Sequence, residues 1–352
     1  MNGDLLEIED LSVVFRGRWG SRPVRAVDGV SLSVSREETV GVVGESGSGK
    51  TTLGLAVVGL RRLSSGAVRF QGEDLSHARR SRRRQLSRHV QMVFQDPYGS
   101  LSPTRTIGQT LVEPLAAHGL FSPAERRQRA VAMLERVGMS EEVLGSYPSE
   151  LSGGQRQRVA IARALMPEPE LVVCDEPVSA LDLSVQAQVL NLLRRLQREL
   201  RLSYLFVGHN LAVVRYMSDR VVVMYRGRVM EVGPAENVYR DPAHPYTQML
   251  VEAAPLADPA SQRSKRSRRE AISSVGMIVD GPGCPFAPRC AFTVEVCRRA
   301  RPPLLATPSG TQAACVRVGE IPRYRANNSS YAGRERFPSM GRKVQEVGEA
   351  TR

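Results

Sequence analysis

A glycine-rich stretch, GESGSGKT, occupies residues 44–51 of this 352-residue chain. It fits the pattern of a phosphate-binding loop, in which glycines are followed by a lysine and a threonine. Glycines let backbone N–H groups close around phosphate oxygens at the positive end of a helix. Lys50 would contact the β and γ phosphates of a nucleotide, and the Thr51 hydroxyl would bind magnesium. The residues predicted to form this cradle are Gly44, Glu45, Ser46, Gly47, Ser48, Gly49, Lys50, Thr51 and Thr52.

Two adjacent carboxylates, Asp175 and Glu176, follow the apolar run LVVC at 171–174. At the end of a buried strand, Asp175 can hold the magnesium ion, and Glu176 can orient or deprotonate a water molecule. Such a pair alone is equally compatible with a helix cap or a salt bridge. The upstream phosphate loop favours the chemical role. Cys174, inside the same run, is predicted to be core packing.

Four of the five cysteines lie near the C-terminal end, with five, six and seventeen residues between them: Cys284, Cys290, Cys297 and Cys315. This spacing suits either two disulfides or a four-thiolate metal site. The N-terminal residues lack the features of a signal peptide, and no apolar run reaches the roughly 20 residues that span a bilayer. We therefore expect a soluble, unexported protein. Since disulfides rarely persist in a reducing cytosol, a metal site is favoured.

The chain carries a net charge of +13, and much of the basic charge lies in two arginine-rich runs at 79–88 and 263–270. Such charge is compatible with nucleic acid, anionic lipid or an acidic partner. Neither run contains an aromatic residue that could stack on bases. We therefore interpret the runs as a solvated face and a linker, and no nucleic-acid partner is expected.

Fully apolar strands that alternate with helices indicate a mainly parallel α/β sheet covered on both faces. The strands are expected before Gly44 and within 89–97, 170–177 and 203–210, and the helices from Lys50 and at 153–165 and 184–200. Alternating polar and apolar residues predict an outer antiparallel sheet from 5–14 and 26–34. We also expect a short strand and turn at 63–75. A hairpin is expected at 220–233, with its turn at Arg226 and Gly227.

The pattern between residues 103 and 150 is helical. One segment, 123–138, places Ala130, Met133, Leu134 and Val137 on one face at helical spacing, which we interpret as packing and not as a binding groove.

The stretch LSGGQRQRVAIARAL, at 151–165, begins with a serine and two glycines before a helical pattern. The glycines leave backbone N–H groups accessible at the start of the helix, which makes a second anion-binding terminus. One chain cannot readily aim both this terminus and the loop at 44–51 at the same phosphate group.

This stretch resembles the signature of ATP-binding-cassette (ABC) ATPases, and further elements of that family follow in the family's order. They are Phe15, the phosphate loop, Gln95, the signature, the acidic strand, Asp182 in SALD, and His209. The resemblance covers about residues 5–250. It implies an ATPase of the ABC type, with an antiparallel β subdomain, a helical subdomain and ATP held between two head-to-tail cassettes.

The resemblance also implies a role for each matching residue. Phe15 would stack on adenine, Gln95 would sense magnesium and the lytic water, Glu176 would be the catalytic base, and His209 would contact the γ phosphate. The signature residues and Asp182 would cover ATP held by the other subunit: Ser152, Gly153, Gly154 and Gln155. The chain departs from the family at Gly208 and Asn210, on either side of His209, which leaves a purely structural histidine as the alternative.

Residues 94–115 and 244–250, followed by GCPFAPRC at 283–290, resemble the ATPase subunits of oligopeptide, dipeptide and nickel importers. That resemblance implies a [4Fe-4S] cluster on the four cysteines, with structural zinc or unligated thiols as alternatives. It implies a second ABC ATPase subunit, identical or homologous, two transmembrane permease subunits and an extracytoplasmic substrate-binding protein as partners. The chain would lie at the cytoplasmic face of the membrane and dock through the helical region after Gln95.

The resulting domain prediction has four parts. An ATPase domain would span 1–255 with a helical subdomain at about 97–160, a basic linker 256–276, a four-cysteine module 277–320, and a disordered tail 321–352. The expected function is ATP-driven import of oligopeptides or dipeptides. The alternatives are nickel import and, from a different class, an ABC protein acting on nucleic acid or ribosomes.

Overall fold

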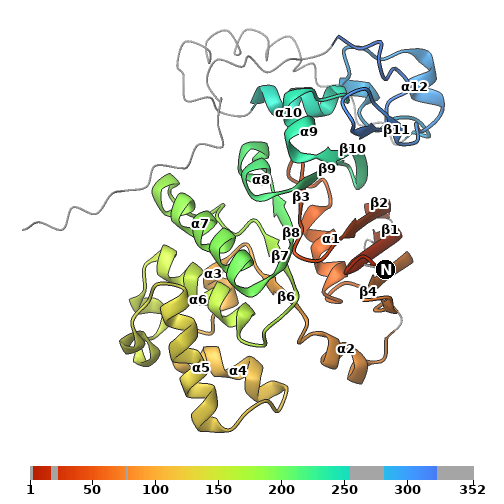
Figure 1. Ribbon diagram of the computed structural model, residues 1–352. Helices are drawn as coiled ribbons and strands as arrows, with labels where there is room; N and C mark the ends of the chain where they lie inside the picture. Colours follow the sequence, from red (N-terminus) through yellow and green to blue (C-terminus); the bar gives the residue numbers. More distant parts are fainter. Residues whose placement is uncertain (1–2, 17–22, 77, 254–280, 323–352) are drawn as a thin grey trace, which may run out of the picture.

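An eight-stranded sheet forms the centre of the computed structural model, which describes residues 3–16, 23–76, 78–253 and 281–322 (Figure 1). Its strand order is β11-β12-β10-β9-β3-β8-β7-β6. The strands from β9 to β6 are parallel, as predicted, whereas β10, β12 and β11 continue the sheet antiparallel. The strands are β3 Thr39–Val43, β6 Val90–Val93, β7 Leu171–Asp175, β8 Ser203–Gly208, β9 Arg220–Tyr225, β10 Arg228–Pro234, β11 Leu305–Ala306 and β12 Gln312–Ala313.

The parallel strands read as apolar runs because both of their faces are buried. In β7, Leu171 and Val173 belong to one hydrophobic core, while Val172 and Cys174 belong to the other, and all four are at most 1% exposed. Each fully buried side chain of this size contributes about 1.5–3 kcal/mol. The prediction that Cys174 packs in the core is confirmed, and burial raises the pKa of its thiol.

A second, four-stranded antiparallel sheet of order β2-β1-β4-β5 packs over one face of the central sheet, together with helix α1 (Lys50–Val57). This confirms the predicted outer sheet. Its strands are β1 Leu6–Phe15, β2 Val24–Val34, β4 Ser65–Phe70 and β5 Glu73–Asp74.

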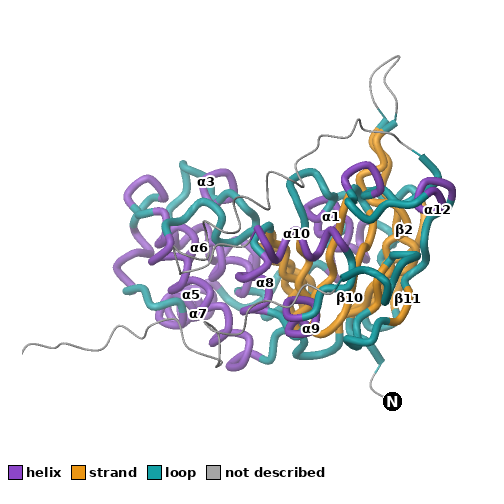
Figure 2. The backbone as a smooth tube through the Cα atoms, turned by 90° about the horizontal axis from the view of Figure 1, so that it is seen from above, coloured by secondary structure: helices purple, strands orange, loops and turns teal. Residues whose placement is uncertain are grey.

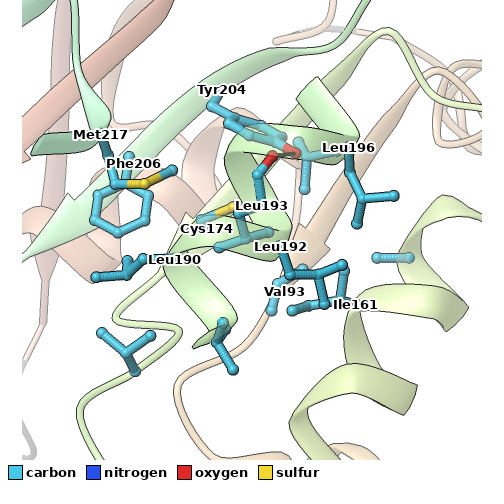
Figure 3. Packing of buried hydrophobic residues seen from close by; sticks show 14 of the residues in the cluster. Val93, Ile161, Cys174, Leu190, Leu192, Leu193, Leu196, Tyr204, Phe206 and Met217 are labelled. Carbon is cyan, nitrogen blue, oxygen red and sulfur yellow. Dashed lines mark hydrogen bonds between the residues drawn. The ribbon is translucent and has the colours of Figure 1, made fainter. Parts of the chain in front are cut away.

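Helices α6 (Gly153–Leu165), α7 (Leu183–Leu200) and α8 (Leu211–Met217) supply apolar residues to the core on the opposite face. Figure 3 shows Leu192, Leu193 and Leu196 of α7 packed over Cys174 and Tyr204, whose hydroxyl donates to the Leu193 carbonyl at 3.0 Å. Seen from above, the helices α3, α5, α6 and α7 lie on one side of the molecule and the strands on the other (Figure 2).

The predicted helical region contains α3 Pro97–Ser100, α4 Ile107–Ala117, α5 Pro123–Arg136 and the 3₁₀ turns η1 Glu141–Gly145 and η2 Pro148–Glu150. The four residues of the apolar stripe on α5 and just after it are buried, which confirms that the stripe is packing. The arginine-rich run at 79–88 forms a helix, α2 (Arg80–Leu86), which the charge pattern did not reveal.

The hairpin of β9 and β10 turns at Arg226 and Gly227, as predicted, and both residues have positive φ angles of 46° and 78°. Such angles at both central positions match the right-handed twist of the strands in a tight hairpin. Helices α9 (Ala235–Arg240) and α10 (Pro245–Ala253) follow the hairpin.

The segment with four cysteines, residues 281–322, contains η3 Ala287–Arg289, α12 Glu295–Arg299 and the short strands β11 and β12. We call it the cysteine module. Strand β12 pairs with β10, so the module extends the central sheet. The buried carboxylate of Glu231 accepts hydrogen bonds from the Ala243 and His244 N–H groups and from the Thr311 hydroxyl, at 2.9–3.0 Å. It thereby ties the module to the start of α10.

The predicted linker and almost all of the predicted tail lie outside the described residues. In the described ranges, no helix is both long enough and apolar enough to cross a bilayer.

Candidate functional site

The loop between β3 and α1 surrounds the side chain of Lys50. The residue as a whole is 4% exposed. Its Nζ donates to the carbonyls of Gly44 and Glu45 at 2.9 Å each and lies 3.3 Å from the Ser48 hydroxyl. Burial lowers the pKa of Lys50, while the nearby carboxylates of Glu176, Asp175 and Glu45 act in the opposite direction. A buried cation with only three neutral acceptors is placed to receive an anionic ligand.

Two of the loop glycines are required by the backbone. A Cβ at Gly44 would lie 2.1 Å from the Met224 carbonyl oxygen, and one at Gly49 would lie 2.0 Å from the Ala26 carbonyl oxygen. Gly49 also has a φ of 99°, which side chains rarely allow. The loop is therefore wedged between β9 and β2, while Ser46 and Gly47 at its tip are exposed.

The carboxyl end of β7 brings Asp175 to the start of α1. The Thr51 hydroxyl donates to Asp175 Oδ1 at 3.0 Å, and Asp175 is 3% exposed. Burial raises the pKa of Asp175, whereas the hydrogen bond from Thr51 acts in the opposite direction. A hydroxyl and a carboxylate in contact beside a phosphate loop are hard oxygen ligands of the kind Mg²⁺ prefers. The next residue, Thr52, is partly buried in the first turn of α1.

Glu176, Gln95 and His209 converge after the carboxyl ends of three neighbouring strands, β7, β6 and β8. Gln95 Nε2 donates to Glu176 Oε2 at 3.4 Å, and His209 Nδ1 lies 2.9 Å from the same oxygen. The Glu176 side chain is 13% exposed and that of His209 is 58% exposed. The histidine is thus not a buried structural residue. Ligands of parallel sheets bind beyond the carboxyl ends of the strands, where this cluster lies.

Phe15 lies at the end of β1 and is 37% exposed. Its register partner is Val24, and two residues further along β2, Ala26 touches Gly49, so β2 connects Phe15 with the phosphate loop. The guanidinium of Arg61 lies 5.3 Å from the centre of the Phe15 ring. An exposed ring at this edge can stack on a planar base.

The signature residues form the capped start of α6. The Ser152 hydroxyl accepts from the Gln155 N–H at 3.3 Å, and the Gln155 side chain accepts from the Ser152 N–H at 2.9 Å. A Cβ at Gly154 would lie 2.6 Å from Val185 of α7, so this helix start packs closely on the segment after Asp182. Asp182 in turn caps α7 by accepting from the Val185 N–H at 3.0 Å.

The predicted site therefore falls into two groups. Lys50, Asp175, Glu176, Gln95 and His209 form one cluster with the phosphate loop. The hydrogen bonds recorded for Ser152, Gly153, Gly154, Gln155 and Asp182, within the described part of the chain, stay inside the two helix starts and do not reach that cluster.

The four cysteines of the module are free thiols that line one cavity of about 20 Å³, together with apolar side chains such as Phe286 and Phe292. Burial raises the pKa of Cys290 to about 11 and also raises the pKa of Cys284 and Cys315. The Cys284 N–H donates to the Cys297 carbonyl at 2.8 Å. Across the described ranges, no three His, Cys, Asp or Glu side chains are arranged to hold a metal ion.

The structure also brings residues to the phosphate loop that the sequence did not indicate. Tyr246 of α10 and Arg289 of the cysteine module both contact Glu45. Tyr246 lies in the predicted importer-like stretch at 244–250, but nothing in its spacing points to the loop 201 positions earlier.

The strand, glycine loop and helix, with a carboxylate pair at the end of β7 two strands away in the same sheet, define a P-loop nucleoside triphosphatase of the cassette type. Comparison with known proteins agrees. Residues 27–179 match the ABC transporter family, and residues 230–297 match the C-terminal region of oligopeptide/dipeptide transporters.

Among similar proteins, the oligopeptide transport ATP-binding protein OppF of Salmonella typhimurium is 45% identical over 308 residues, covering 85% of this chain and 92% of that protein. A probable peptide ABC transporter ATP-binding protein, y4tS of Sinorhizobium fredii, is 47% identical over 293 residues, covering 83% and 82%. The dimeric structure of the ATP-binding cassette MJ0796 bound to ADP and Pi aligns with a TM-score of 0.60 at 28% identity, covering 65% of this chain and 98% of that one.

The chain therefore belongs to the ATP-binding subunits of ABC transporters, in the group that carries the oligopeptide/dipeptide C-terminal region. It is an ABC ATPase. The predictions of family, fold class and enzymatic activity are confirmed.

Proposed function

We propose that this ATPase powers the import of oligopeptides or dipeptides through a separate membrane permease. The observation that carries the proposal is the 45% identity, over 85% of the chain, to proteins described as oligopeptide transport ATP-binding proteins. The match of residues 230–297 supports peptides over nickel, the alternative cargo. A role on nucleic acid or ribosomes has only the basic charge in its favour.

In this proposal each residue of the cluster acts on bound ATP. Lys50 and backbone N–H groups of the loop and of the start of α1 hold the β and γ phosphates, and the exposed ring of Phe15 stacks on adenine. Glu176 accepts a proton from the attacking water, while Gln95 and His209, which both contact the Glu176 carboxylate, orient the water and the γ phosphate. Thr51, Asp175 and Gln95 fit a magnesium ion, which would neutralise the β and γ oxygens when bound.

The separation of the signature from this cluster supports an ATP site that two cassettes form together. At the start of α6 the Gln155 N–H is taken by the Ser152 hydroxyl, whereas the Gly153 and Gly154 N–H groups show no hydrogen bond to the described residues and can receive an anion. We place ATP between the phosphate loop of one cassette and Ser152, Gly153, Gly154, Gln155 and Asp182 of a second, identical or homologous. The two permease subunits would dock on the helical region 97–160, and an extracytoplasmic protein would deliver the cargo. The chain would then act at the cytoplasmic face of the membrane.

The assembly can be tested by purifying the tagged chain from its own host in mild detergent. We expect a second ABC ATPase, or a second copy, together with two multi-spanning proteins. In the reconstituted complex, a binding protein loaded with peptide should stimulate ATP hydrolysis more than the empty protein or a nickel-loaded one. Recovery of ribosomes or DNA without membrane proteins would refute the importer.

We also propose that the cysteine module holds a metal group, either a [4Fe-4S] cluster or zinc, on Cys284, Cys290, Cys297 and Cys315. The chemistry of the donors supports a metal, since four free thiols line one cavity in a segment with little core of its own. In the described residues these thiols are not arranged around one point, so they would have to move together to bind a metal. Soft thiolates select such metals, and a bound metal would deprotonate thiols that burial otherwise keeps neutral. The main contribution would be to stabilise the module.

Metal analysis of anaerobically purified protein tests this directly. A cluster predicts a brown protein with near four irons per chain, and structural zinc predicts a colourless protein with about one zinc. Cys297→Ser should lower the metal content in either case, whereas Cys174→Ser, in the core of the ATPase, should not. Metal-free protein from anaerobic cells would contradict the proposal.

A further inference from the structure

Glu45, the second residue of the phosphate loop, is held from three sides. Its carbonyl accepts from Lys50, and its N–H donates to the hydroxyl of Tyr246 at 2.8 Å. Its carboxylate accepts two parallel hydrogen bonds from Arg289, Nη1 to Oε2 at 2.8 Å and Nη2 to Oε1 at 3.0 Å. The first contact lies within the loop. The other two come from α10 and from the cysteine module.

Arg289 is itself firmly placed. It ends the turn η3, next to Cys290, and its guanidinium also lies 3.4 Å from the Tyr225 hydroxyl and 3.5 Å from Met249 Sδ. It lies 5.7 and 5.8 Å from the ring centres of Phe286 and Tyr225. The guanidinium of Arg289 makes two hydrogen bonds to one carboxylate and also lies against two rings. A lysine ammonium cannot make the paired hydrogen bonds and the ring contacts together.

A buried aromatic cluster lies beside the ion pair of Arg289 and Glu45. Phe286 of the module packs on Tyr225 of β9 and Tyr246 of α10, with ring centres 5.4 Å apart in both pairs, and the two tyrosines lie 4.6 Å apart. All three side chains are at most 4% exposed. Aromatic contacts of this kind fix the module against the central sheet beside the phosphate loop.

These contacts orient the peptide that positions Lys50. The Glu45 N–H donates to the Tyr246 hydroxyl, which fixes the Glu45 backbone. In this conformation the carbonyl oxygens of Gly44 and Glu45 both point at Lys50 Nζ. Arg289 holds the same residue by its side chain. A loop that is ordered before the nucleotide arrives loses less conformational entropy on binding.

We propose that Arg289 is a positioning residue for the nucleotide site: through Glu45 it fixes the phosphate loop, so that ATP affinity depends on the docked cysteine module. Arg289 acts on the loop and not on the phosphates, because its guanidinium is engaged by the Glu45 carboxylate. The module thereby has a role at the ATP site that is separate from holding a metal.

The test measures ATP·Mg affinity of the full-length chain in a Glu176→Gln background, which separates binding from turnover. Arg289→Met should weaken ATP binding about three- to tenfold, the range for a bidentate ion pair that is partly exposed, and Arg289→Lys should restore part of the loss. In the enzyme with Glu176 intact, Arg289→Met should raise KM for ATP by a similar factor with kcat within about twofold.

A double-mutant cycle shows whether the effect passes through Glu45. Glu45→Gln should weaken binding as Arg289→Met does, and the double variant should be no weaker than either. The matched control is Arg299→Met, which removes an arginine of the same module that is 74% exposed and paired with Glu295 at 3.2 Å, and which should leave ATP affinity unchanged.

The proposal is overturned if Arg289→Met binds ATP as tightly as the unmodified protein, or if the two losses add in the double variant. Should Arg289→Met unfold the module, Glu45→Gln decides the question, because it removes the same ion pair from the loop side. Unchanged affinity in Glu45→Gln then overturns the proposal. Inactivity of the unmodified chain toward ATP would contradict the ATPase assignment instead, so the two failures are distinct.

Discussion

Glu176→Gln should lower the rate of ATP hydrolysis by about 10²- to 10⁴-fold, the usual contribution of a general base. The amide has the shape of the carboxylate but cannot accept the proton of the attacking water. ATP binding should persist, because Lys50 and the loop are untouched. The variant should therefore accumulate as an ATP-bound pair of cassettes, measured by single-turnover hydrolysis and by the mass of the complex.

The chain offers a closely matched control in Glu168→Gln. Both residues are glutamates with a positive φ angle, 58° at Glu168 and 45° at Glu176. Glu168 lies before β7, whereas Glu176 lies after it. Its exposed side chain pairs with Arg129 on the surface. This variant should hydrolyse ATP at the normal rate. Undiminished hydrolysis by Glu176→Gln would remove Glu176 from the role of base.

Lys50→Met should weaken ATP binding by about 10- to 100-fold and abolish measurable hydrolysis at ordinary ATP concentrations. The lost contact is a charged hydrogen bond to phosphate, of the kind that contributes about 1.5–3 kcal/mol. Burial lowers the pKa of Lys50, so its charge is held at a cost to the fold that offsets the lost hydrogen bonds to the Gly44 and Glu45 carbonyls, and the melting temperature should change little. Calorimetric titration with ATP and a thermal melt separate the two effects.

Two further variants serve as a second test and a control for this prediction. Lys50→Arg should also bind ATP poorly, since a planar guanidinium does not fit a site closed by the Gly44 and Glu45 carbonyls. Arg36→Met removes a cation that pairs with Glu170 at 2.6 Å and precedes β3, and it should leave affinity unchanged. If Lys50→Met bound ATP normally, the loop at 44–51 would not be the phosphate site.

The order of elements was predictable because each parallel strand is buried on both faces and so reads as an apolar run. The roles of Gln95, Glu176 and His209 at one site were implied by the resemblance to ABC ATPases, and the residues meet because β6, β7 and β8 are neighbours and place their carboxyl ends together. Helix α6 was predictable from its serine, its glycines and the apolar positions that follow. Its observed bounds, Gly153–Leu165, are those predicted.

Other features left no local signal. Strands β11 and β12 are two residues each, too short to show alternation, and their place is set because β12 pairs with β10 and β11 pairs with β12. Helix α2 is rich in arginine and lacks the apolar period by which amphipathic helices are recognised. The ion pair of Arg289 and Glu45 joins residues 244 positions apart, and only tertiary packing brings them together.

The central claim is that ATP is bound between two cassettes. The most direct measurement is a structure of the Glu176→Gln protein in its assembled complex with ATP and magnesium. We predict that each γ phosphate contacts Lys50, or its counterpart, on one cassette and the helix start at Ser152 and Gly154, or their counterparts, on the other. Nucleotide enclosed by the loop and the signature of a single chain would contradict the account.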